Sequence, residues 1–130
     1  MSPEKIKILL VDDEPDILEF MVYNLKREGY QTFTAKNGQE AVDIAKIEHP
    51  NLIILDIMMP GMDGYAATAK IREYEALHNL PRTPIVALTA NALPSDREKC
   101  LAVGMDDFLA KPFKAADIEA MLKRWSPSHD

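Results

Sequence analysis

Five short apolar runs, each followed by a stretch with helical spacing, constrain this chain more than any other feature of its sequence. The runs are Ile6–Val11, Tyr30–Ala35, Leu52–Leu55, Pro84–Leu88 and Asp107–Ala110. Pro15 suits the first turn of the helix after the first run, and Gly29 suits its end. Further helices are expected from Asn37-Gly38 to His49, from Tyr65 to Leu77, from Ser95 to Gly104 and from Ala115 to Trp125. Strands that alternate with helices indicate a parallel sheet covered on both faces.

Five such strand–helix units leave few possible topologies, because the crossovers between parallel strands are right-handed. The commonest is an α/β fold, the (βα)5 doubly wound five-stranded parallel sheet with the flavodoxin-like strand order 2-1-3-4-5. In the second helix, the residues expected on the inner face are Ala41, Ile44, Ala45 and Ile47. A chain of 130 residues predicts a single domain, residues 1–130 with a core of about 6–125, and no output domain.

Charge and composition exclude several classes of function. The chain has 15 Lys and Arg against 21 Asp and Glu, a formal net charge of -6. This balance argues against direct binding to nucleic acid or to an anionic membrane. The single cysteine, Cys100, allows no internal disulfide and is expected to pack within the fourth helix. With no signal peptide and no membrane-length apolar run, a cytoplasmic location is the default expectation.

Polar side chains stand where the strands end, which is where open parallel sheets place their functional residues. They are Asp12, Asp13, Asp56, Thr89 and Lys111. Taken singly, each has an ordinary structural explanation: a helix cap, a turn that binds backbone amides, a strand end, or a lysine stem at the edge of the core. Those explanations do not account for three carboxylates and one ammonium at one edge of the sheet, because clustered carboxylates repel one another unless a cation or proton intervenes.

The strand-end residues together predict a metal-assisted phosphoryl acceptor. A hard divalent cation such as Mg²⁺ binds one or two carboxylates, a backbone carbonyl and waters. Asp56 would then be the nucleophile that accepts a phosphoryl group. The metal and Lys111 would neutralise charge on that group, and Thr89 would donate a hydrogen bond to it.

Four motifs add a resemblance that covers essentially the whole chain. They are LVDDE at 10–14, LDIMMPGMDG at 55–64, ALTA at 87–90 and FLAKPF at 108–113. Jointly and in this order, they resemble the receiver domain of two-component response regulators, a CheY-like superfamily. The resemblance implies that Asp56 takes its phosphoryl group from a phosphohistidine. It also implies that Asp13, Asp56 and the backbone carbonyl of Met58 hold Mg²⁺, with Asp12 acting through a water.

The same resemblance implies a switch. Lys111 would contact the phosphoryl group, the bond between Lys111 and Pro112 would be cis, and Thr89 and Phe108 would be the switch pair. Phosphorylation adds a charge of about −2, so Thr89 would turn toward it and vacate space that the Phe108 ring can fill. The surface of the fourth helix, fifth strand and last helix would then change shape. The alternative for Phe108 is a plain core aromatic.

Three residues would flank the phosphoryl group: Met58, Ala90 and Asn91. The thioether of Met58 cannot position an attacking water, so the sequence predicts slow self-dephosphorylation. The three histidines, His49, His78 and His129, lie away from every strand-end motif and are assigned no role.

The resemblance also bears on partners. The segment from Leu88 to Phe113 is most similar to receivers of hybrid histidine kinases and phosphorelays, whereas the first half is similar to receivers of DNA-binding transcription regulators. The expected partners are a histidine kinase or a histidine phosphotransfer protein, and a downstream protein target or a fused domain. Asp117–Met121 lacks the arginine that one large class of DNA-binding receivers carries on the last helix, which favours a monomer; a dimer formed on phosphorylation is the alternative.

Three other functions are weighed against this one. A phosphatase of the haloacid-dehalogenase type needs a second aspartate where Met58 stands. A flavin-binding relative of flavodoxin would place phosphate against Asp12, Asp13 and Glu14, which would repel it. A receiver-fold interaction module without phosphotransfer is the third. We expect no enzyme activity beyond the chain's own phosphorylation and dephosphorylation.

Overall fold

The computed structural model describes residues 6–59, 61–90 and 94–125, and every structural statement below refers to these residues. The strands are β1 (Lys7–Val11), β2 (Gln31–Ala35), β3 (Leu52–Asp56), β4 (Ile85–Thr89) and β5 (Asp107–Ala110). The helices are α1 (Pro15–Arg27), α2 (Gly38–Glu48), α3 (Gly64–Leu77), α4 (Pro94–Val103) and α5 (Ala115–Trp125). Each expected element is present, and most boundaries lie within one or two residues of the prediction.

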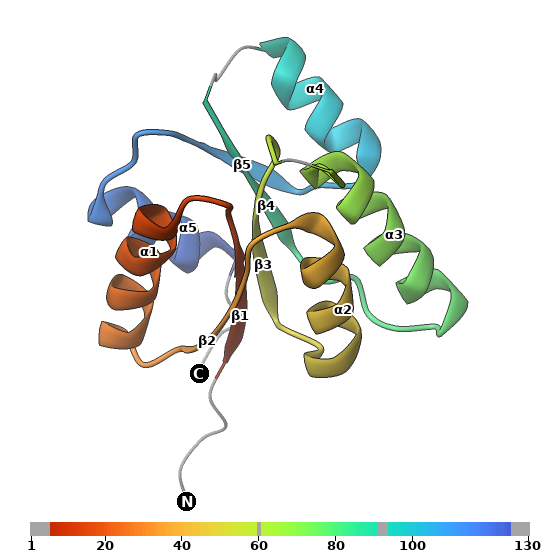
Figure 1. Ribbon diagram of the computed structural model, residues 1–130, viewed down its shortest axis with the longest axis horizontal. Helices are drawn as coiled ribbons and strands as arrows, with labels where there is room; N and C mark the ends of the chain where they lie inside the picture. The colour runs from red at the N-terminus through yellow and green to blue at the C-terminus, as the bar shows by residue number, and fades with distance from the viewer. Residues whose placement is uncertain (1–5, 60, 91–93, 126–130) are drawn as a thin grey trace, which may run out of the picture.

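The five strands form one parallel sheet in the order β2-β1-β3-β4-β5, which confirms the predicted topology. Figure 1 shows α1 and α5 on one face of this sheet and α2, α3 and α4 on the other. Each face has its own apolar cluster, and both clusters draw on side chains of the central strands. The central strands β3 and β4 are buried at every position because helices cover them on both sides.

One expectation about α2 is wrong. Ile47 is not on the inner face, because it is 73% exposed, whereas Val42 is buried. Ile47 follows the buried Ala45 by two residues, which is about 200° around an α-helix. Val42 precedes Ala45 by three residues and therefore shares its face.

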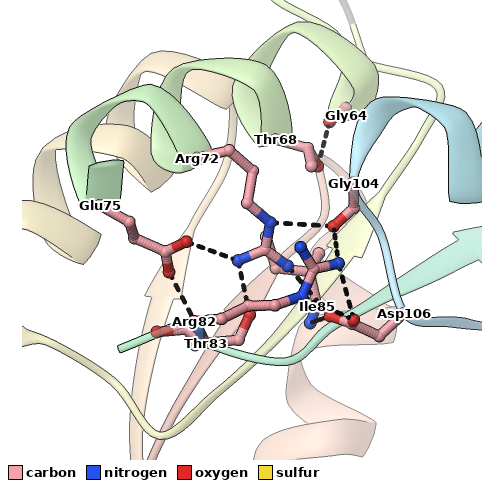
Figure 2. A network of polar contacts seen from close by, with 9 residues as sticks. All are labelled: Gly64, Thr68, Arg72, Glu75, Arg82, Thr83, Ile85, Gly104 and Asp106. Carbon is pink, nitrogen blue, oxygen red and sulfur yellow. Dashed lines mark hydrogen bonds and ion pairs between the residues drawn. The ribbon is translucent and has the colours of Figure 1, made fainter. Parts of the chain in front are cut away.

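At the amino ends of the strands, Arg72 of α3 joins three segments (Figure 2). Its Nε donates to the carbonyl of Gly104 at 2.9 Å, and its Nη1 donates to Glu75 Oε1 and to the Thr83 carbonyl, both at 2.8 Å. Its Nη2 donates to Asp106 Oδ2 at 3.0 Å. A single guanidinium thus ties α3 to the chain that enters β4 and to the loop between α4 and β5.

A second arginine completes this network. Arg82 donates through Nη2 to the Gly104 carbonyl at 2.9 Å and to Asp106 Oδ1 at 2.8 Å. Asp106 Oδ2 also accepts from the backbone N–H of Ile85 at 2.9 Å. We call Arg72, Glu75, Arg82, Gly104 and Asp106 the arginine clamp. It fixes the carboxyl end of α4 and the start of β5 at the edge of the sheet opposite the strand-end motifs.

Candidate functional site

Two neighbouring strands bring the acidic residues together. β1 and β3 pair with Val11 opposite Leu55, so Asp12 and Asp56, which follow these residues, stand side by side. One carboxylate oxygen from each of Asp12, Asp13 and Asp56 lies within 4.8 Å of the other two. Asp12 is fully buried and Asp56 is 3% exposed, whereas Asp13 faces solvent.

Backbone amides hold one oxygen of each buried carboxylate. Asp12 Oδ1 accepts from the N–H of Glu14 at 2.9 Å, and Asp56 Oδ1 accepts from the N–H of Met58 at 3.2 Å. The residue that caps α1 is Glu14, without a side-chain cap bond, so the helix-cap explanation for Asp12 and Asp13 is wrong. Asp56 does accept an amide of its turn, but this leaves its second oxygen for other partners.

Lys111 reaches those second oxygens from the end of β5. Its Nζ lies 3.0 Å from Asp12 Oδ2 and 3.5 Å from Asp56 Oδ2. It also lies 3.4 Å from Glu14 Oε1, an exposed partner that no sequence pattern assigned to the site. The bond between Lys111 and Pro112 is cis, as the resemblance implied.

The site holds more negative than positive charge. Burial and the neighbouring Asp12 carboxylate raise the pKa of Asp56 to about 6, with a smaller contribution from Asp13 in the same direction, although Lys111 and the Met58 amide act against this rise. Burial lowers the pKa of Lys111, but the carboxylates of Asp12, Asp56 and Glu14 outweigh it and raise this pKa above its ordinary value. The carboxylates therefore repel one another more than one ammonium can compensate.

The donor set fits a hard divalent cation. In the described part of the chain, Asp12 Oδ2 is the buried side-chain oxygen that has no hydrogen bond; its contact with Lys111 is an ion pair without hydrogen-bond geometry. Carboxylate oxygens with surplus negative charge are the ligands that Mg²⁺ prefers. Asp12, Asp13 and Asp56 together could therefore hold this ion directly or through water.

Gly64, the first residue of α3, lets that helix approach the site closely. A Cβ at this position would lie 2.5 Å from the carbonyl oxygen of Asp56 and 2.8 Å from Ile57 Cα. Its N–H donates to the Ile57 carbonyl at 3.0 Å and ties the end of the loop to β3. From the sequence alone Gly64 is only a loop residue; its packing role depends on β3 and α3 meeting in space.

The other predicted residues lie around this centre. Thr89 ends β4, between β3 and β5, and is 6% exposed. Met58 is 74% exposed, Ala90 faces solvent, and Phe108 is half-buried against the core cluster of α2, α3 and α4. Asn91 lies outside the described residues.

The residues that were given no role in the chemistry lie elsewhere. His49 and His78 are exposed and cap the carboxyl ends of α2 and α3. His129 lies outside the described residues. Cys100 is 2% exposed and belongs to the same core cluster as Phe108, so its expected packing role is confirmed.

A doubly wound sheet with clustered carboxylates and a lysine at its carboxyl edge defines a signalling receiver of the CheY-like class. The chain belongs to the response regulator receiver domain family, whose sequence profile matches residues 8–123. It is therefore a response regulator receiver domain of two-component systems.

Curated relatives resemble this chain over part of their own length. It is 39% identical over 117 residues to the alkaline phosphatase synthesis transcriptional regulatory protein PhoP of Bacillus subtilis, covering 90% of this chain and 47% of that protein. The chain spans about half the length of the curated relatives it matches.

Two solved structures bear on the site. The receiver domain of the sensor histidine kinase PA1611 of Pseudomonas aeruginosa, solved with a magnesium ion coordinated in its active-site cleft, is 43% identical, with a TM-score of 0.82 over 94% of this chain and 98% of that one. The Ssk1 receiver domain of Saccharomyces cerevisiae, crystallised with the histidine phosphotransfer protein Ypd1, is 30% identical, with a TM-score of 0.88 over 97% of this chain and 92% of that one. Among the described residues, no helix combines the length and apolar character needed to cross a membrane.

Proposed function

We propose that this chain accepts a phosphoryl group on Asp56 from a phosphohistidine of a histidine kinase or a histidine phosphotransfer protein. The observation that carries the proposal is the position of the Asp56 carboxylate. It is buried at a strand end, 3.5 Å from the Lys111 ammonium and within 4.8 Å of the Asp12 and Asp13 carboxylates. The magnesium in the PA1611 receiver and the pairing of the Ssk1 receiver with Ypd1 support the same chemistry and the same class of donor.

The transfer exchanges one bond for another. An oxygen of the Asp56 carboxylate attacks phosphorus, an O–P bond forms, and the P–N bond to the donor imidazole breaks with its electron pair left on nitrogen. The Lys111 ammonium neutralises charge on the transferred group, and the Thr89 hydroxyl donates a hydrogen bond to one of its oxygens.

Asp13, Asp56 and the Met58 carbonyl would hold Mg²⁺, with Asp12 acting through a water. When bound, the ion supplies positive charge that stabilises the anionic oxygens of the group in transfer. The chain promotes only its own phosphorylation and dephosphorylation.

The signalling output of phosphorylation is a change in the shape of the domain surface. Thr89 and Phe108 are the switch pair, and the face formed by α4, β5 and α5 binds a downstream protein or a fused domain. The acidic charge of the chain supports a protein partner over nucleic acid. We propose that this single receiver domain works in the cytoplasm as a monomer, with dimerisation on phosphorylation as the alternative.

Acetyl phosphate tests this function directly. The purified protein is incubated with acetyl phosphate and Mg²⁺, and its intact mass is measured beside Asp56→Asn and an EDTA control. We expect a gain of one phosphoryl group in the wild type only, and only with Mg²⁺. A folded wild type that gains no mass would favour the interaction module without phosphotransfer; equal labelling of Asp56→Asn would place the acceptor elsewhere.

A further inference from the structure

An arginine of α4 lies against the aromatic ring of the proposed switch. The guanidinium carbon of Arg97 is 5.8 Å from the centroid of the Phe108 ring, a distance at which a cation is attracted to the ring face. Arg97 is exposed and Phe108 is half-buried. Among the described residues, the ring of Phe108 is the one partner of the Arg97 guanidinium, and none of the ion pairs involves Arg97.

The two ends of α4 are held in different ways. Its carboxyl end is held by the arginine clamp, because Arg72 and Arg82 both donate to the Gly104 carbonyl at 2.9 Å (Figure 2). A Cβ at Gly104 would lie 3.1 Å from Arg72 Cγ, so the chain and the clamp are in close contact there. Arg97 lies in the amino-terminal half of α4. Its exposed guanidinium joins this half of the helix to Phe108 of β5 through the cation–ring contact.

Because of this difference, α4 is fixed near Gly104, and its amino-terminal half is the end that can move. We propose that the contact of Arg97 with Phe108 stabilises the resting position of the ring. This contact then sets how readily the domain switches on phosphorylation. The inference rests on the proposed function. If the ring moves inward as Thr89 turns toward the phosphoryl group, the guanidinium loses its partner, so the contact favours the unphosphorylated arrangement alone.

The size of the effect follows from the exposure of the pair. Exposed cation–ring contacts contribute about 0.5–1 kcal/mol, which corresponds to about a two- to fivefold change in the equilibrium between the two arrangements. A ligand that binds only the switched arrangement shows the same factor in its apparent affinity while the resting arrangement dominates.

The test measures binding of Mg²⁺ with beryllofluoride, a non-covalent mimic of the phosphoryl group, by calorimetry. Arg97→Gln should bind it about two- to fivefold more tightly than the wild type, and Arg97→Lys should fall between them because a cation remains. Lys99→Gln is the matched control, since it removes a charge from an exposed position on the same helix. Its affinity should stay at the wild-type value.

A double-mutant cycle shows whether Arg97 acts through the ring. In a Phe108→Leu background, Arg97→Gln should no longer change the affinity. The ring resonances of Phe108 in metal-free Arg97→Gln should also move toward their positions in the beryllofluoride complex.

Three outcomes would contradict this role of Arg97. The first two are an unchanged affinity of Arg97→Gln for Mg²⁺–beryllofluoride, and a weaker affinity because the arginine attracts the anion. The third is an equal gain in affinity in the Phe108→Leu background. A folded wild type that binds no Mg²⁺–beryllofluoride would instead contradict the proposed function itself.

Discussion

Replacing Asp56 by asparagine should stabilise the protein when no metal is bound. Burial and the Asp12 carboxylate raise the pKa of Asp56 from 3.8 to about 6, so the charged form is disfavoured in the folded state. Each pKa unit corresponds to about 1.4 kcal/mol, and the charge therefore destabilises the metal-free fold by about 3 kcal/mol above pH 6. The asparagine side chain would carry no charge, and its amide oxygen can still accept from the Met58 N–H.

The size of this stabilising effect depends on pH. Because the pKa of Asp56 is raised in the folded state, its protonated carboxyl group contributes fully to the free energy of unfolding below pH 3.8. This contribution is lost as the pH rises through about 6. Asp56→Asn should thus unfold with a free energy up to about 3 kcal/mol higher than the wild type near pH 8. The two proteins should differ little near pH 3.8, where the wild-type carboxyl is largely protonated.

Urea unfolding followed by circular dichroism, in EDTA, measures this difference at both pH values. Asp43→Asn is the control, because Asp43 is exposed on α2 and its replacement should change stability by less than about 0.5 kcal/mol. Added Mg²⁺ should stabilise the wild type, by about 2.7 kcal/mol at about 100 times its dissociation constant, and the variant much less. An Asp56→Asn protein that is less stable than the wild type near pH 8 without metal would refute the reasoning, since Asp56 would then be stabilised rather than repelled by its surroundings.

Three further changes test other parts of the structure. Met58→Asn places an amide beside the proposed phosphoryl group where it can orient water, so phosphate loss from the labelled protein, followed by intact mass, should accelerate about tenfold, which corresponds to about 1.4 kcal/mol of barrier; an unchanged rate would show that the side chain at position 58 does not control hydrolysis. Gly64→Ala forces a Cβ against the Asp56 carbonyl, so thermal unfolding should show a loss of about 1–3 kcal/mol and Mg²⁺ affinity should fall; a variant as stable as the wild type would mean that the two elements separate freely. Burial raises the pKa of Asp107, but hydrogen bonds from Trp125 and other donors outweigh it and lower this pKa below 3.8, so Asp107→Asn should lose about 1–2 kcal/mol near neutral pH, a difference that disappears as pH falls through the lowered pKa. A loss that stays constant down to pH 2 would show that the charge of Asp107 is not involved.

Much of the fold and of the acidic site was predictable from the order of residues. Alternating apolar runs and helical patterns fixed the parallel sheet, since each strand needs a covering helix and each crossover is right-handed. Polar residues directly after the runs identified Asp12, Asp56, Thr89 and Lys111, because parallel strands all end at the same edge of the sheet.

Contacts between distant side chains were decided by the tertiary structure. Glu14 and Lys111 stand 97 residues apart in the chain and meet because β1 and β5 end at the same edge. Helical spacing misplaced Ile47, which follows Ile44 by three residues but lies about 200° around the helix from the buried Ala45. No sequence pattern marked Arg97 as the partner of Phe108.

The sequence by itself determined which elements form and which chemical groups stand at their ends, because both depend on local spacing and on rules of chain connection. The tertiary structure alone decided which oxygen of each carboxylate faces the lysine, how far burial raises the pKa of Asp56, and which cation lies over the Phe108 ring. Those properties depend on distances of a few ångströms between segments that are separate in the chain, and they are fixed only when the elements pack together.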